Sequence, residues 1–475
     1  MTSPKKTNIF SLLLSHFRGL FDFSSLSFVE NGRKMTLFSL ALPAFLQTFF
    51  NSLIGTVNTL LLSGYADDTV GATTAANQII STATLILNMT YIGAAVLVSI
   101  EFGKGKREEA KRITGCALIL TLISGCLFSL VIAFAAEPLL TLLNLEGEAL
   151  AYGKSYLIIR GTALFIVALN SFFAGMLICN GYTLHAFIKG VIGNVANVIL
   201  GYTFLYGGVI PSLTGTSAIA VGGVIATAIE LLFAVIVFAR LKCPICPAFS
   251  LSLTKNILYI GAPGSVSGIS YTLAQVITTG FMGGIGIVAL NAKSYVASIV
   301  YYTYLFSYAI GVGTKILMGR YAGSGDVEKR KQLYRTSLVM AVFANVLFSL
   351  AVLILNQPLI SIFTENKEIL TMVPIIFLVD VAVELFRAIN HVSESSLNAN
   401  KDVFTTLLAS TLSCWLGSVL LSYFLGIVLG MGLLGCWIAF ACDEGIKAII
   451  YVIRWKSGKW LARSEFSRGE KNQKA

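Results

Sequence analysis

Charged residues are scarce in this sequence, and their scarcity excludes an ordinary soluble domain. Of the 475 residues only 12% are Asp, Glu, Lys or Arg, whereas about a quarter is typical of soluble proteins. Hydrophobic residues make up 56% of the chain, and the mean hydropathy is +0.81. A soluble fold cannot hide so much apolar surface from water. We therefore expect an integral membrane protein.

The sequence also has few of the residues that carry catalysis or bind metals. It holds three histidines and no nucleophile–base set, phosphate-binding loop or metal-ligand spacing, so we expect neither an enzyme nor a bound cofactor. Most of the eight cysteines lie in apolar segments. The exception is "CPIC", with Cys243 and Cys246, and a single CxxC is a weak metal or redox signal. The N-terminal "TNIFSLLLSHFRGLFDF" lacks the features of a signal peptide, and is either a short interfacial helix or a frayed tail.

Long apolar runs, by contrast, are abundant. A helix needs roughly 20 such residues to cross a bilayer. Runs of this length predict twelve transmembrane helices, at residues 37–63, 72–100, 115–135, 156–178, 184–206, 217–239, 257–280, 295–318, 337–356, 371–397, 403–425 and 430–453.

The net charge of +11 is distributed unevenly between the connections. Lys and Arg gather in alternate connections, such as "GKGKREEAKR" and "GRYAGSGDVEKRKQLYR", and in the C-terminal tail. The intervening "YADDTV" and "LNLEGEAL" contain neither residue. This positive-inside pattern places both termini in the cytoplasm of a multi-pass protein, which we assign to the plasma membrane. The basic charge reflects topology, and we expect the lipid bilayer, not nucleic acid, as its partner.

The chain also repeats itself. Sliding the sequence by 220 positions aligns several landmarks, among them Pro43 with Pro263, Gly93 with Gly313 and Asn170 with Asn390. Six helices per half is an even number, so both halves have the same orientation, as in transporters whose substrate path lies between parallel repeats. The sequence thus predicts an all-α integral membrane protein of two six-helix lobes. The expected segments are a cytoplasmic or interfacial tail (1–35), an N-lobe (36–239), a cytoplasmic linker (240–256), a C-lobe (257–453) and a basic tail (454–475).

An ordered set of motifs resembles the multidrug and toxic compound extrusion (MATE) family over residues 36–460. The motifs are "ALPAFLQTFFNSLIGTVNTLLLSGY", the loop "GKGKREEAKR", "NGYTLHAFIKGVIGNVANVILGYTFLYG" and the closing "RWKSGKW". The resemblance implies an antiporter that exports organic, often cationic, compounds by alternating access and uses a proton or sodium gradient.

The sequence departs from the family pattern at its N-lobe acids. Where the resemblance implies an aspartate in the first helix, this chain has Asn58. In the fifth helix it keeps Asn197 but has Gly201 in place of the acid. Neither position can titrate, so coupling through the N-lobe in the family manner is not expected.

One helix carries a stripe of charge. Asp380, Glu384, Arg387, His391 and Glu394 follow each other at spacings of four, three, four and three, and so share one helix face. A charge at the bilayer centre costs at least about 2.5–3.5 kcal/mol, so the stripe faces the protein interior or a watery cavity. Asn390 and its repeat counterpart Asn170 flank the corresponding surfaces.

Two interpretations of the stripe remain open. It is either a self-neutralising structural network centred on Glu384 and Arg387, or an ion-coupling site. In the second, which we favour, Asp380 and Glu384 bind a proton or Na⁺ in competition with the substrate, and Arg387 controls their ionisation.

Other charges lie within predicted spans. Glu230 has no basic neighbour on its own helix and is either a site residue or the partner of a distant base. Arg160 and Lys315 are candidate partners for it or for Asp380. A third group, Asp443, Glu444 and Lys447, has helical spacing and indicates an internal structural pair.

We therefore expect a monomeric exporter of small organic molecules. One alternative is a flippase for lipid-linked or anionic substrates, which would need a cationic cavity. A second is a membrane sensor or assembly protein that does not transport. The residues available for a cationic cavity are Arg160, Lys293, Lys315 and Arg387.

Overall fold

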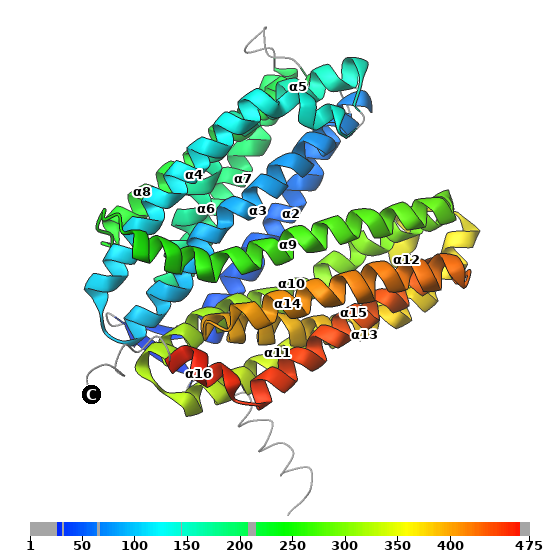
Figure 1. Cartoon of the computed structure of the whole chain (residues 1–475). Coiled ribbons are helices and arrows are strands. Elements are labelled where there is room, and N and C mark those ends of the chain that lie inside the picture. Colours follow the sequence, from blue (N-terminus) through cyan, green and yellow to red (C-terminus); the bar gives the residue numbers. More distant parts are fainter. Residues whose placement is uncertain (1–25, 31–32, 64–66, 144, 208–214, 466–475) are drawn as a thin grey trace, which may run out of the picture.

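The structure is a computed structural model that describes residues 26–30, 33–63, 67–143, 145–207 and 215–465. Apart from one short hairpin, its regular elements are helices (Figure 1). The first half of the chain contains α2 (Leu37–Ser63), α3 (Asp67–Gly103), α4 (Arg107–Thr141), α5 (Gly147–Thr162), α6 (Leu164–Cys179), α7 (Thr183–Tyr206) and α8 (Gly215–Arg240). The second half contains α9 (Leu251–Ile285), α10 (Ile287–Ser324), α11 (Val327–Ile354), α12 (Asn356–Ser361), α13 (Lys367–Ala399), α14 (Val403–Ser413), α15 (Gly432–Lys456) and α16 (Lys459–Glu465).

The predicted spans all form helices. Within the described residues, eight helices are long and apolar enough to cross a membrane, or nine when the pair α5 and α6, bent by 50°, is taken as one span. The remaining three predicted spans form α2, α9 and α15, which are 27, 35 and 25 residues long. The fold is therefore the predicted one, twelve transmembrane helices in two lobes.

Two helices depart from regular geometry. The span 156–178 is not one rod, because the chain turns at Ala163 between α5 and α6. The helix that begins as α14 continues as two π-helical segments, Cys414–Leu420 and Tyr423–Val428. Segments of this kind have hydrogen bonds between residues five apart and are rare in proteins.

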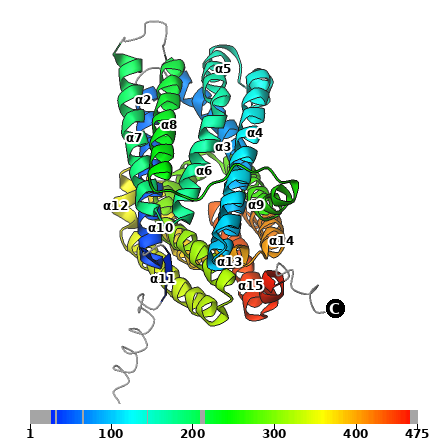
Figure 2. The ribbon, with the colours of Figure 1, turned by 90° about the vertical axis from the view of Figure 1, so that its left-hand side faces the viewer.

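The two lobes meet at one end and diverge at the other (Figure 1). In the side view of Figure 2, α4, α7 and α8 lie in one lobe, while α11, α13 and α15 lie together in the other. The lobes touch where α3 and α10 end, next to the basic loops, and they separate toward α5 and α12.

Glycines allow the close approach at this seam. A Cβ on Gly93 of α3 would lie 2.0 Å from the carbonyl oxygen of Ile257 in α9. A Cβ on Gly261 of α9 would lie 1.8 Å from the carbonyl oxygen of Met89. Both are closer than a real Cβ atom comes to a backbone oxygen, so the two helices pack backbone to backbone, as helices with small residues do in membranes.

A buried arginine also joins the lobes near this end. The Nη2 atom of Arg320 in α10 donates to the carbonyl oxygen of Cys179 at the end of α6, at 2.8 Å. Its guanidinium carbon lies 4.4 Å from the centre of the Phe102 ring on α3. The Arg320 side chain is fully buried, so the seam excludes water at this point.

The N-terminal segment contains an element that was not predicted. Strands β1 (Ser27–Glu30) and β2 (Arg33–Thr36) form an antiparallel hairpin before α2. The flanking side chains Leu26 and Met35 are buried in a hydrophobic cluster that includes Trp455 and Trp460. The predicted interfacial helix falls in residues 1–25, outside the described residues.

Candidate functional site

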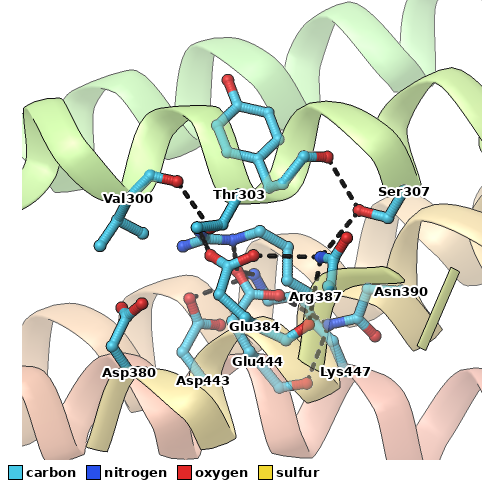
Figure 3. Close-up of polar contacts among 12 residues, drawn as sticks. Val300, Thr303, Ser307, Asp380, Glu384, Arg387, Asn390, Asp443, Glu444 and Lys447 are labelled. Carbon is cyan, nitrogen blue, oxygen red and sulfur yellow. Dashed lines mark hydrogen bonds and ion pairs between the residues drawn. The ribbon is translucent and has the colours of Figure 1, made fainter. Parts of the chain in front are cut away.

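Helix α13 lies at the centre of the C-lobe, between α10, α11 and α15, and carries the predicted charged stripe. Figure 3 shows the side chains of Glu384, Arg387 and Asn390 pointing toward Glu444 and Lys447 on α15. The structure therefore brings into one network two groups of charges that the sequence had treated separately.

Glu384 is the most deeply buried member of this network. Its side chain is 0% exposed and forms an ion pair with Arg387 one turn away. The other carboxylate oxygen accepts a hydrogen bond from Nδ2 of Asn345 on α11, at 3.0 Å. The same amide nitrogen lies 3.0 Å from the hydroxyl of Ser307 on α10. Three helices thus converge on a single carboxylate.

Arg387 connects Glu384 to the acids of α15. Its Nε lies 4.0 Å from Oε1 of Glu444, and its guanidinium carbon lies 5.5 Å from the centre of the Tyr304 ring. Asn390 donates to Oε2 of Glu444 at 2.6 Å. The guanidinium is therefore shared between two buried carboxylates.

Lys447 completes the network. Its Nζ lies 3.2 Å from Glu444 Oε1 and 3.1 Å from Asp443 Oδ2, as the helical spacing predicted. Asp380 lies one turn before Glu384 and accepts a hydrogen bond from Trp437 Nε1 at 3.0 Å. Among the described residues, the bases that form ion pairs with these acids are Arg387 and Lys447. We call the four acids and two bases together the acidic cluster: Asp380, Glu384, Arg387, Asp443, Glu444 and Lys447.

Two amides beside the acidic cluster keep unused acceptors. The Oδ1 atoms of Asn345 and Asn390 are buried, and no described residue donates to either. Buried polar atoms are normally paired, so these two oxygens mark a place that is rich in acceptors and poor in donors.

The last two residues of the predicted stripe lie outside the acidic cluster. His391 packs against the rings of Tyr304 and Tyr308, each with its centre 5.9 Å away. Its Nε2 is buried and has no hydrogen-bond partner among the described residues. Glu394 accepts from Asn398 on its own helix at 3.4 Å.

The N-lobe holds a smaller polar cluster around Glu230. Lys189 on α7 lies 3.0 Å from Glu230 Oε2, and Asn170 donates to the same oxygen at 2.6 Å. Glu230 is therefore paired with a distant base, one of the two predicted alternatives, and that base is Lys189 instead of the candidates Arg160 and Lys315. Lys189 was missed because a single lysine in an apolar helix does not indicate which neighbouring helix it faces.

The remaining predicted N-lobe residues lie near α8. The Arg160 guanidinium and the Asn197 amide both lie over Gly223, because a Cβ there would be 2.5 Å from Nη1 of Arg160 and 3.4 Å from Oδ1 of Asn197. At Gly201 a Cβ would meet only apolar atoms of Ile219 and Leu61. The side chain of Asn58 falls outside the described residues.

The cations of the flippase alternative have separate surroundings. Arg160 lies against Gly223 in the N-lobe, and Arg387 is held by Glu384 in the C-lobe. Lys293 donates to the Thr279 hydroxyl at 2.9 Å. These contacts give three of the four cations different environments.

Two six-helix lobes in parallel orientation, each with buried charges inside, define a secondary transporter of the membrane. The family model described as MatE matches residues 43–203 and 263–424, once in each lobe and at the offset of the internal repeat. The chain belongs to the MATE family of transporters.

Relatives agree along nearly the whole chain. An uncharacterized transporter, YisQ of Bacillus subtilis, is 28% identical over 436 residues, which cover 91% of this chain and 96% of the relative. A probable multidrug resistance protein NorM of Thermotoga maritima is 23% identical over 444 residues, covering 91% and 94%.

Solved structures share the fold. A MOP superfamily transporter from Pyrococcus furiosus, described as having a binding pocket of reversed polarity that suggests a different function, superposes with a TM-score of 0.83 at 17% identity. A multidrug resistance MATE family transporter in an outward-facing conformation has a TM-score of 0.82 at 18% identity. Each comparison covers 90% of this chain and 96% of the other.

Proposed function

We propose that this protein is an efflux antiporter that exports cationic or amphipathic organic compounds in exchange for protons or Na⁺. The observation that carries the proposal is the acidic cluster of the C-lobe, in which four buried carboxylates face two basic side chains. The relatives described as multidrug resistance proteins support export of organic compounds.

The imbalance of charge creates a demand for a further cation. Uncompensated buried charges are costly in a medium of low dielectric, so the acidic cluster is stabilised when a proton, a metal ion or an organic cation joins it. The unused Oδ1 atoms of Asn345 and Asn390 add neutral oxygen acceptors beside the carboxylates. Oxygen-rich surroundings suit hard cations such as Na⁺.

Competition for this cluster produces exchange. When a proton or Na⁺ occupies Asp380 and Glu384, the negative charge that holds an organic cation is reduced, and the substrate leaves. In this scheme Arg387 keeps Glu384 and Glu444 in position, and its positive charge offsets part of the negative charge of the acidic cluster. Binding of the ion therefore opposes binding of the substrate through charge, and the two need not contact each other.

The arrangement of the lobes fits the releasing stage of this cycle. They are in contact beside the basic loops, which the positive-inside pattern places in the cytoplasm, and they diverge at the other end. We therefore assign this structure to an outward-facing state of a transporter that works by alternating access.

Export into proteoliposomes under separate proton and Na⁺ gradients tests the proposal. We expect one of the two gradients to drive transport of a fluorescent organic cation. Glu384→Gln and Asp380→Asn should each lower gradient-driven transport by about tenfold or more, because a neutral amide does not replace a buried carboxylate at the coupling site. Glu328→Gln is the matched control, since Glu328 is exposed in the first turn of α11. Transport near the normal rate in both site variants would show that coupling occurs elsewhere.

A further inference from the structure

The N-lobe has the opposite charge balance to the acidic cluster. Among the described residues within its spans, the one carboxylate at the lobe centre, Glu230, is already paired with Lys189 at 3.0 Å. Arg160 is half-buried on α5, and its guanidinium forms no ion pair or hydrogen bond with any described residue. Because Glu230 and Lys189 neutralise each other, the net positive charge of these three residues comes from Arg160.

The surroundings of Arg160 form a small cradle. Gly223 on α8 leaves room for the guanidinium, because a Cβ at that position would lie 2.5 Å from Nη1. The amide of Asn197 on α7 lies over the same glycine and likewise has no hydrogen bond to a described residue. Three helices thus present a cation, an amide and a bare backbone at one place.

The helix that carries Asn197 also lacks an acid that the family resemblance implies. Gly201 stands one helical turn after Asn197, and α8 packs so closely there that a Cβ on Gly222 would lie 3.1 Å from the Gly201 nitrogen. The family resemblance implies an acid at position 201. Its replacement by glycine leaves donors without a carboxylate to oppose them.

We propose that Arg160 and Asn197 form a subsite for the carboxylate group of the exported molecule. A guanidinium is planar and presents paired N–H donors that match the two oxygens of a carboxylate. The substrate would then be zwitterionic, with its anionic group at Arg160 in the N-lobe and its cationic group at the acidic cluster in the C-lobe. This inference rests on the proposed export function and adds the substrate class.

A pair of dyes separates the two poles of such a substrate. An aminoxanthene dye with a free benzoate carries both charges, and its methyl ester carries the cation alone. We expect Arg160→Gln to lower transport of the free acid by about tenfold, the loss of one charge-assisted contact, and to leave the ester within about twofold of wild type. Arg160→Lys keeps the charge but not the paired donors, so its transport of the free acid should lie between that of Arg160→Gln and that of the wild type.

A second variant moves the guanidinium without removing it. Gly223→Ala places a methyl group against the flexible end of Arg160, so the protein can fold while the guanidinium shifts. It should lower transport of the free acid selectively, as Arg160→Gln does. Gly280→Ala is the control, because no atom lies within 4 Å of a Cβ at that exposed position in α9.

Equilibrium binding of the two dyes to purified protein distinguishes failure of the subsite proposal from failure of the export proposal. Selective loss of free-acid binding in Arg160→Gln supports the subsite, even where the wild type fails to transport either dye and the export proposal is therefore wrong. Equal effects on both dyes, or no effect on either, would overturn the subsite whatever the transport result.

Discussion

At the scale of single residues, the function proposed here depends on side chains whose partners come from other helices. Glu384 receives Arg387 from its own helix but Asn345 from α11, and Glu230 receives Lys189 from α7. The Glu384 and Lys189 side chains are almost completely buried, so removing the partner of either one leaves a buried charge with an unpaid desolvation cost.

Replacing Asn345 tests this dependence. Asn345→Leu removes the donor to Glu384 and to Ser307 while filling a similar volume. We expect the free energy of unfolding to fall by about 1–3 kcal/mol, because a buried carboxylate loses a hydrogen bond. Thermal unfolding in detergent measures the change, and Glu328→Gln, which alters only an exposed side chain, provides the comparison. Equal stability of the Asn345 variant and the wild type would show that Glu384 does not need this donor.

Lys401 offers a second residue-scale prediction. It follows α13 with a φ of 64°, whereas the repeat-related position is Gly181, with a φ of 79°. Burial, and next the nearby charge of Lys104, lower the pKa of Lys401 to about 8. A left-handed conformation costs a residue with a side chain roughly 1–2 kcal/mol, which glycine avoids.

We therefore expect Lys401→Gly to stabilise the protein by about 1 kcal/mol or more at pH 7. A lysine whose folded-state pKa is lowered destabilises the fold while it is charged, and this penalty fades as the pH rises from about 8 toward the unfolded pKa. The advantage of the variant should accordingly shrink between pH 7 and pH 10. Unfolding midpoints across this range measure it, and an advantage that grows with pH would contradict the assignment.

At the scale of elements, the sequence predicted which helices exist more successfully than how they meet. Apolar runs defined all twelve spans because a bilayer fixes the minimum length of a crossing helix. The stripe on α13 was also visible, since residues three and four apart share a helix face. The contributions of Asn345 and Lys189 were not, because periodicity within one helix contains no information about the helix opposite.

Some features of the elements had no signal that could have revealed them. Nothing in the span 156–178 predicted the bend between α5 and α6, and the π-helical continuation of α14 has no distinctive sequence pattern. The strands β1 and β2 were assigned to a tail because they are short, although the dipeptide "NG" between them in the sequence is typical of hairpins.

The glycine seam gives a prediction at this scale. Gly93→Ala forces a methyl group against the Ile257 carbonyl, which is backbone and cannot move aside without displacing α9 from α3. We expect the lobes to separate beside the basic loops and to approach each other at the opposite end. Spin labels at positions 154 and 367, one in each lobe, should report a shorter distance than in wild type. A distance unchanged from that of Gly280→Ala would show that the seam does not control the conformation.

At the scale of the whole molecule, the two lobes have diverged in charge while they kept their architecture. The C-lobe gathers acids around α13 and α15, and the N-lobe has a paired Glu230 and a separate Arg160. A molecule held between them would experience a field from one lobe to the other. This polarity is a property of the assembled pair, and neither half of the sequence shows it alone.

The same amide–carboxylate bond occurs in both lobes. Asn170 donates to Glu230 at 2.6 Å, and Asn390 donates to Glu444 at 2.6 Å. The neighbouring lysine comes from α7 in one lobe and from α15 in the other. The two asparagines are repeat counterparts, but the carboxylates are not, because Glu230 aligns with Ile450 at the same offset. The same substitution at either asparagine consequently removes an amide–carboxylate bond from one lobe at a time, so each lobe serves as the internal control for the other.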